Sequence, residues 1–450
     1  MASAPKLYSS CVEWLDDWTR DMPPMVDTYD LAQWMEDEGA EAIQFFVESA
    51  FRKPRTRADA LDVLRALVWE HFLFQQDLVV QRLTARTDAV GRLLALPQTA
   101  QKSAAWYAEA RNLLTGHEFA GVVYGTETAF QAAVARKCCP EMVLTGDEPP
   151  ESRIVYRTPV AEEGDAVGRS GLSPFQWGWR YESVVRALYE ETQAKGRVDD
   201  TLGRIRHPTL PRLAASPDGL VCEGSRAGRL VEIKSPITRV LTGVLPEEYY
   251  CQIQLQAEVA DVEAVDYIEV RFDAFPAEDL QSDPSVRQRC LTPPAAKPMH
   301  GATPPPARMG VVLVVAPSVD ADPLTWTYAY SPIWPLEAAA IETAITWLPP
   351  DLPAGAVILE RSVWRVQDWW TTTVPRNRRW WSEVGEPSYR RFWEAVDEAR
   401  LHGRFGNTCL IADEDVEEKE EKEEKEEKEK NGKVHVKNAG TTGCLILDEE

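Results

Sequence analysis

The segment Leu230–Pro236 places an acid and an amine at strand spacing. Alternate side chains of a strand point to opposite faces, so Glu232 and Lys234 would share one face, and Val231 and Ile233 the other. A carboxylate in this position can bind a hard cation. The lysine can orient or deprotonate a water, or stabilise charge on a phosphate. A Glu-x-Lys pair alone is more often a solvated strand face, so the neighbouring elements decide between the two interpretations.

A second carboxylate, Asp218, precedes this strand. Residues 213–220 are expected to form a strand that ends in a turn at Asp218. Gly224 and Gly228 predict a hairpin between Asp218 and Glu232. Adjacent antiparallel strands would bring both carboxylates within reach of one metal ion. An ordinary turn aspartate is the alternative.

A third acid, Glu182, lies on an expected helix. Ser173 suits the N-cap and Pro174 the first helical position. Glu182 follows Gly178 by one turn, and we expect this glycine to let the helix approach a neighbouring element closely. A surface glutamate is the alternative interpretation of Glu182.

A further helix is expected over residues 247–259. Gln252 and Gln256 share one of its faces, because residues four apart are neighbours on a helix. Their amides could donate to a phosphate or a water at the edge of a carboxylate site. Solvent-facing glutamines are the alternative.

The order of these segments is more specific than any one of them. After the helix with Glu182 come Ser-Pro-Asp-Gly at 216–219, Glu-Ile-Lys-Ser-Pro at 232–236 and Tyr-Tyr-Cys-Gln-Ile-Gln at 249–254. This order resembles the YqaJ-like viral recombinase family, the lambda-exonuclease and alkaline-nuclease branch of the PD-(D/E)XK superfamily, in the versions found in large DNA viruses. The resemblance covers about residues 104–275 and extends more loosely to 374–381.

The resemblance implies roles for individual residues. Divalent metal, Mg²⁺ or Mn²⁺, would be bound by Asp218, Glu232 and the carbonyl of Ile233, with support from Glu182. The residues implied in catalysis are Glu182, Asp218, Glu232, Lys234, which would position the attacking water, and Gln252 at the edge of the site. The residues implied in DNA binding are Arg111, Thr115, His117, Ser216 and Gln254. Gly116-His117 stand where the family usually has Ala-Ser, which puts strict dependence on a DNA end in question.

The implied fold is of the α/β (α+β) class, with a PD-(D/E)XK restriction-endonuclease-like core, a mixed sheet flanked by helices, and helical additions at both ends. The implied enzyme is a Mg²⁺-dependent phosphodiester hydrolase, a 5′–3′ exonuclease on linear duplex DNA in viral recombination or genome processing. Two alternatives stay open: an endonuclease or resolvase of the same fold, and a catalytically silent DNA-binding or virion-structural protein. Duplex DNA with a free end, single-stranded DNA and an annealing protein are the expected partners, and both monomer and trimer are compatible with the resemblance.

Composition limits the other possibilities. The net charge of −23 argues against a protein that coats nucleic acid by bulk positive charge. No run of eighteen apolar residues occurs, so we expect no membrane span, and the N-terminus does not resemble a secretory signal. Eight cysteines without a Cys-x-x-Cys pair favour reduced thiols, and hence an intracellular protein of the host cytoplasm or nucleus.

Patterning along the chain predicts four parts. The tryptophans and arginines of the third part could stack unpaired bases, although a helical core with outward arginines is the stronger interpretation. The fourth begins with twelve acids and five lysines in residues 413–430, which cannot bury apolar area. The parts are a helical region 1–103, a nuclease core 104–334 with a proline-rich loop 291–308, a mostly helical part 335–412 rich in Trp and Arg, and an acidic tail 413–450.

Overall fold

The computed structural model describes residues 4–19, 28–82, 87–101, 103–138, 172–292, 306–322 and 325–402. The predictions made for the acidic tail and for most of the proline-rich loop lie outside these residues. Among the helices described, none has the length and apolar character needed to cross a membrane.

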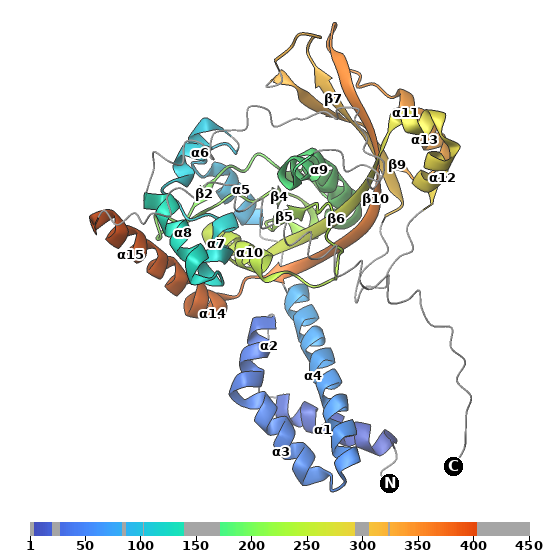
Figure 1. Ribbon diagram of the computed structural model, residues 1–450. Helices are drawn as coiled ribbons and strands as arrows, with labels where there is room; N and C mark the ends of the chain where they lie inside the picture. The colour runs from blue at the N-terminus through green and yellow to red at the C-terminus, as the bar shows by residue number, and fades with distance from the viewer. Residues whose placement is uncertain are drawn as a thin grey trace, which may run out of the picture.

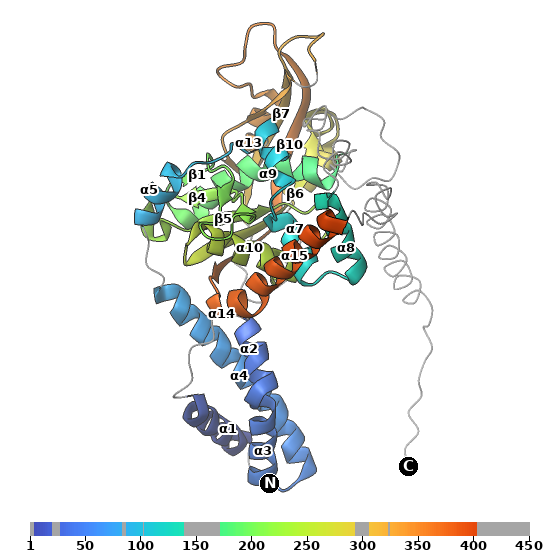
Figure 2. The same cartoon turned by 90° about the vertical axis from the view of Figure 1, so that its left-hand side faces the viewer.

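The N-terminal helices pack around an apolar core of their own, which includes Leu15, Ile43, Leu64 and Phe72. Figures 1 and 2 show this group projecting below the rest of the molecule. Its elements are α1 (Ala4–Thr19), α2 (Thr28–Trp34), the π-helical turn η1 (Met35–Gly39), α3 (Ala40–Ala50) and α4 (Pro54–Arg82). The hydroxyl of Tyr29 on α2 donates to Glu383 at 2.8 Å, so this helix contacts the larger part of the protein.

An eight-stranded sheet organises the larger part, in the order β1-β4-β5-β6-β10-β7-β8, with β9 also paired to β7. Its strands are β1 (Val198–Asp199), β4 (Gly219–Val221), β5 (Leu230–Lys234), β6 (Ala264–Pro276), β7 (Arg308–Ala316), β8 (Thr327–Tyr330), β9 (Trp334–Pro335) and β10 (Val357–Pro375). A separate pair joins β2 (Ile205–Arg206) to β3 (Ala214–Ala215). Among the strands described, β5 and β6 form the one parallel pair in this sheet, which confirms a mixed sheet.

Two helices cover opposite faces of the sheet near β5 (Figure 1). A parallel strand pair needs a long crossover, and α10 (Glu247–Ala260) lies in the crossover from β5 to β6. The other face is covered by α9 (Pro174–Tyr189), which begins with a capping box between Ser173 and Gln176. The α9 core packs with Val231 and Ile233. The predicted α+β class, a mixed sheet flanked by helices, is therefore confirmed.

Further helices share one apolar core with α10. Figure 2 shows α7, α8 and α15 beside α10. These helices are α5 (Thr87–Ala95), α7 (Gly116–Val123), α8 (Glu127–Cys138), α14 (Arg378–Trp380), the π-helical turn η6 (Trp381–Gly385) and α15 (Glu386–His402). The short helix α6 (Ala104–Ala110) precedes α7 and has no buried residue. This layer presents the start of α7 to the carboxyl end of β5.

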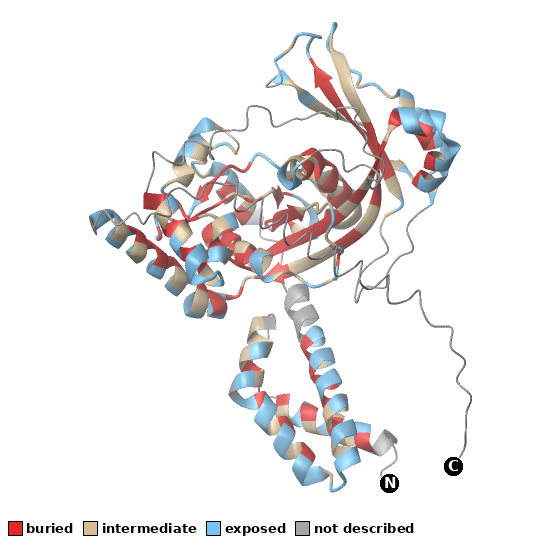
Figure 3. Ribbon diagram, viewed as in Figure 1, coloured by how far each residue is buried: buried red, intermediate tan, exposed pale blue. Residues whose placement is uncertain are grey.

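Strand β10 corrects one prediction. We expected residues 335–412 to be mostly helical, but Val357–Pro375 is the longest strand described. It pairs with β6 from Ala264 to Pro276 and with β7 from Met309 to Ala316. Its valines, threonines and tryptophans favour a strand. Figure 3 shows β6 and β7 buried along most of their length, whereas β10 alternates between buried and intermediate stretches. The sheet continues after the proline-rich loop with β7 and β8.

Short helices cover the distal end of the sheet. They pack on Phe275, Leu313 and Val363 of β6, β7 and β10. These helices are α11 (Ala277–Ser282), α12 (Pro284–Leu291) and α13 (Ala338–Thr346). The distal cover therefore rests on the same strands that continue toward β5.

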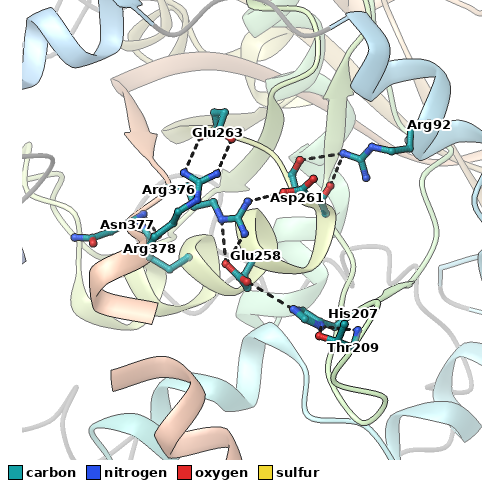
Figure 4. A network of polar contacts seen from close by, with 11 residues as sticks. Arg92, His207, Thr209, Glu258, Asp261, Glu263, Arg376, Asn377 and Arg378 are labelled. Atoms are coloured by element: carbon teal, nitrogen blue, oxygen red, sulfur yellow. Dashed lines mark hydrogen bonds and ion pairs between the residues drawn. The ribbon is translucent and has the colours of Figure 1, made fainter. Parts of the chain in front are cut away.

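Ion pairs anchor the end of β10 to α10 (Figure 4). The guanidinium of Arg376 binds Glu258 at 2.7 Å and Asp261 at 2.7 Å, and Arg378 binds Glu263 at 2.8 Å. Trp380, two residues beyond Arg378, is buried. These two arginines are thus engaged by carboxylates, as expected for arginines that surround a core of tryptophans rather than a platform for bases.

Candidate active site

The structure places Glu232 and Lys234 on the face of β5 that α10 covers. Glu232 is fully buried, and its Oε1 lies 2.5 Å from Nζ of Lys234. Val231 and Ile233 point to the α9 side. The alternation inferred from the sequence is therefore correct, and the acid and the amine form a direct ion pair.

Asp218 lies beside β5 because β4 and β5 pair in antiparallel register. Gly219 is opposite Val231, and the connection between the strands uses Gly224 and Gly228 at positive φ. The Oδ2 of Asp218 accepts a hydrogen bond from the backbone nitrogen of Ile233 at 2.8 Å. One detail of the prediction is wrong: Asp218 precedes β4 rather than ending a strand over 213–220, because the chain turns between β3 and β4.

Gln256 is a site residue that our sequence reasoning left unassigned. Its Nε2 donates to Oε2 of Glu232 at 2.6 Å, and both side chains are buried. Lys234 forms the ion pair with Oε1, so each oxygen of the buried carboxylate has one polar partner. The helical spacing of Gln252 and Gln256 was the available signal, since both face β5 from α10.

The charges of the site act strongly on one another. Burial raises the pKa of Asp218 well above its usual range, and Glu232 and then Glu182 raise it further. Burial alone would lower the pKa of Lys234, but the carboxylates of Glu232 and Asp218 raise it above its ordinary value. Lys234 is thus a cation that donates hydrogen bonds, whereas the negative charge of Asp218 is only partly compensated by Lys234 and by the backbone nitrogen of Ile233.

Glu182 reaches the site from α9, on the opposite side of β5 from Glu232. Its influence on the pKa of Asp218 shows that the two carboxylates lie near each other. The expected close approach at Gly178 is wrong, because a Cβ added there would meet nothing within 4 Å. Glu182 is therefore held by the packing of α9 as a whole.

The donor set suits a hard divalent cation. Asp218, Glu232 and the carbonyl of Ile233 would offer oxygen ligands, and a cation would relieve the repulsion that raises the pKa of Asp218. In the described residues no three Asp, Glu, His or Cys side chains converge closely enough to hold a metal as they stand. The carboxylate oxygens are instead engaged by Lys234, Gln256 and the nitrogen of Ile233.

The two other glutamines predicted on α10 differ in position. Oε1 of Gln252 accepts from Nζ of Lys234 at 3.2 Å, so Gln252 lies at the edge of the site. Gln254 does not: it is buried, donates to the carbonyl of Pro375 at 2.9 Å and accepts from the nitrogen of Asn377 at 2.7 Å. Its predicted role in DNA binding does not fit the structure, because its amide ties α10 to the end of β10.

The start of α7 lies against α10 at the site. A Cβ on Gly116 would stand 2.9 Å from Cγ of Gln252, so glycine is required for this approach. Thr115 is the N-cap residue of α7. The ring of His117 contacts exposed Phe175 at 6.1 Å between centroids. Desolvation by the surrounding protein lowers the pKa of His117, and the positive charge of Lys234 lowers it further, which places His117 near the lysine.

Ser216 and Arg111 are the remaining predicted DNA contacts. The Oγ of Ser216 accepts from Nε1 of Trp106 at 3.0 Å in the turn that leads to Asp218. Arg111 ends α6, and its Nε is buried with no hydrogen-bond partner among the described residues. Leu114 bridges to Leu213, which joins the α6–α7 segment to the chain before Asp218.

Fold and site together define a mixed-sheet α+β domain with an Asp…Glu-x-Lys centre on adjacent strands. The family model of the YqaJ-like viral recombinase domain matches residues 111–263, which contain Glu182, Asp218, Glu232 and Lys234. This part of the chain matches the model of that family, as the order of its motifs predicted.

Individual relatives are distant. The uncharacterized protein R354 of Acanthamoeba polyphaga mimivirus is 27% identical over 150 residues, which are 28% of this chain and 26% of that protein. The chain thus matches about a quarter of the length of this curated relative. An alkaline exonuclease from Laribacter hongkongensis is 18% identical over 67% of this chain and 95% of its own, with a TM-score of 0.35. A phage-related exonuclease from Haemophilus somnus is 13% identical over 71% and 92%, with a TM-score of 0.26.

Proposed function

We propose that this protein is a divalent-metal-dependent DNA nuclease, a 5′–3′ exonuclease on linear duplex DNA that acts in viral recombination or genome processing. The observation that carries the proposal is the convergence of Asp218, Glu232 and Lys234 through the pairing of β4 with β5. The viral recombinase domain over residues 111–263 agrees with it.

The residues divide the work of phosphodiester hydrolysis. Asp218, Glu232 and the carbonyl of Ile233 would hold Mg²⁺ or Mn²⁺, with Glu182 nearby. The bound metal would supply Lewis-acid stabilisation of phosphate charge and a more acidic water. Lys234 is held as a cation, so it would orient the attacking water or stabilise the phosphate by donation rather than accept a proton. Gln252 and Gln256 keep Lys234 and Glu232 in place.

The first turn of α7 supports an interaction with a DNA end. Backbone N–H groups at a helix start favour phosphate, and His117 stands there near Lys234. The buried Nε of Arg111 adds a donor without a partner in the described part of the chain. A 5′-phosphate close to the carboxylates would set the polarity of digestion.

The test is digestion of linear duplex DNA, labelled at either the 5′ or the 3′ end, with and without Mg²⁺. We expect mononucleotides released from the 5′ end only with metal, and covalently closed circular DNA left intact. Glu232→Ala should abolish release, and Glu223→Gln should not, since Glu223 is a largely exposed acid between β4 and β5. Activity that survives Glu232→Ala would refute the site, whereas cleavage of closed circles would favour an endonuclease.

A further inference from the structure

The ring of Tyr249 lies over the ammonium group of Lys234. Tyr249 is in the first turn of α10, three residues before Gln252, so both side chains face the end of β5. Nζ of Lys234 is 4.8 Å from the ring centroid. The same nitrogen is 2.5 Å from Glu232 and 3.2 Å from Oε1 of Gln252. A carboxylate, an amide and an aromatic face therefore surround this ammonium group.

Two further side chains hold the Tyr249 ring. Tyr267 of β6 stacks with it at 6.0 Å between centroids and 29° between planes. The guanidinium of Arg239, in the loop after β5, lies 5.3 Å from its centroid. Arg239 forms an ion pair with Glu269, a buried acid that is opposite Lys234 in the β5–β6 register. The loop, β6 and α10 thus meet on this one ring.

The contact matters because a lysine side chain is long and flexible. Lys234 ends β5 and keeps 24% of its side-chain surface exposed, so strand packing alone does not restrict its ammonium group. The face of an aromatic ring attracts a cation and leaves water less room around it. Such a contact acts through the ring and does not need the phenol hydroxyl.

We infer that Tyr249 is a positioning residue for Lys234, itself held by Arg239, Glu269 and Tyr267. The inference rests on the proposed function, in which Lys234 acts on the water or the phosphate. The ring would contribute to the rate by keeping the ammonium group directed at the reacting atoms, and would contribute little to DNA affinity.

The first experiment measures position without activity. In protein labelled at Cε of its lysines, the ring current of Tyr249 should shift the Lys234 ε-CH₂ proton resonance upfield, and Lys234→Met assigns that signal by removing it. Tyr249→Leu should move the signal downfield, and Tyr249→Phe should keep it. Arg239→Gln, which leaves the apolar core intact, should move it part of the way. A signal that is the same in Tyr249→Leu overturns the inference, whatever the nuclease activity.

The second experiment separates rate from affinity. In single-turnover digestion at saturating DNA, Tyr249→Leu should slow cleavage by roughly 5- to 30-fold, which corresponds to about 1–2 kcal/mol of cation–π attraction. Tyr249→Phe should restore the rate. Tyr250→Leu is the matched control, because Tyr250 contacts Trp380 instead of Lys234. The Kd for DNA in EDTA should not change.

Each outcome has a distinct meaning. Weaker DNA binding with an unchanged maximal rate in Tyr249→Leu would overturn the inference and make the ring a DNA contact. Equal slowing by Tyr249→Leu and Tyr250→Leu would reduce the effect to the folding of α10. A wild-type protein without nuclease activity would contradict the proposed function, while the resonance of Lys234 would still decide whether Tyr249 positions it.

Discussion

The hydrogen bond from Gln256 to the buried Glu232 makes a quantitative prediction. Its length is 2.6 Å and neither side chain is accessible, so no water can replace the amide once it is removed. A hydrogen bond to a charged group contributes roughly 1.5–3 kcal/mol to stability. Oε1 of Gln256 is buried and lacks a hydrogen-bond partner among the described residues. Because leucine also removes this oxygen, part of the stability lost with the hydrogen bond is regained. We therefore expect Gln256→Leu to reduce the free energy of unfolding by about 1.5–2 kcal/mol.

A double-mutant cycle isolates this interaction. In the Glu232→Leu background the amide of Gln256 has no carboxylate to bind, so Gln256→Leu should be neutral or stabilising there. The resulting coupling energy is about 2–3 kcal/mol. Urea unfolding in EDTA at neutral pH, followed by far-ultraviolet circular dichroism, measures all four proteins.

The control is Gln44→Leu on α3, which removes an exposed amide-to-carboxylate bond to Glu48. It should change stability by less than about 0.5 kcal/mol. A coupling energy between positions 232 and 256 below about 0.5 kcal/mol, within the usual error of additivity, would show that Gln256 does not hold the carboxylate. The assignment of Gln256 to the site would then be wrong.

Three further predictions concern the same face of the sheet. Gly116→Ala should destabilise the protein by about 1 kcal/mol, because the added Cβ would contact Gln252. In the Gln252→Ala background the same change should be neutral or stabilising. Equal effects of Gly116→Ala on urea unfolding in both backgrounds would contradict the close approach. Burial raises the pKa of Glu269 from 4.5 to about 6. The folded state therefore binds this proton more tightly, and stability contributed by the group falls by about 2 kcal/mol as pH rises from 4.5 to 6. The stability of Glu269→Gln should not show that fall. Curves of stability against pH that run parallel for wild type and Glu269→Gln would refute the prediction. The raised pKa of Asp218 has the same sign, so without metal Asp218→Asn should gain stability over wild type as pH rises, and Mg²⁺ should raise the melting temperature of wild type only. A rise with Mg²⁺ in Asp218→Asn would argue that the metal binds elsewhere.

The site was predictable where it depends on local geometry. Strand alternation alone places Glu232 beside Lys234, and the glycines at 224 and 228 predict the hairpin that brings Asp218 to β5. The helix with Glu182 was predictable from its capping residues. These features need no knowledge of distant contacts.

The failures come from non-local packing and from neglect of helix periodicity. Gln254 was assigned to the site by resemblance, yet two residues turn a helix by about 200°, which directs it away from Gln252 to Pro375. Gln256 is four residues from Gln252 and faces Glu232, but only the crossover from β5 to β6 shows which face of α10 is covered. Strand β10 pairs with residues of β6 that lie 86 to 111 positions earlier, so its tryptophans were taken for a helical core.

The position of β10 in the sheet has a consequence for synthesis of the chain. Strand β6 ends at Pro276, and its neighbour β10 is complete only at Pro375. At about 5–20 residues per second, the edge of β6 stays unpaired for on the order of ten seconds after the strand has been made. An open edge strand is a template for pairing with other chains. The nascent protein is thus most exposed to aggregation in the interval after Asp218, Glu232 and Lys234 have been synthesised. The interval ends when β10 has been synthesised and can pair with β6.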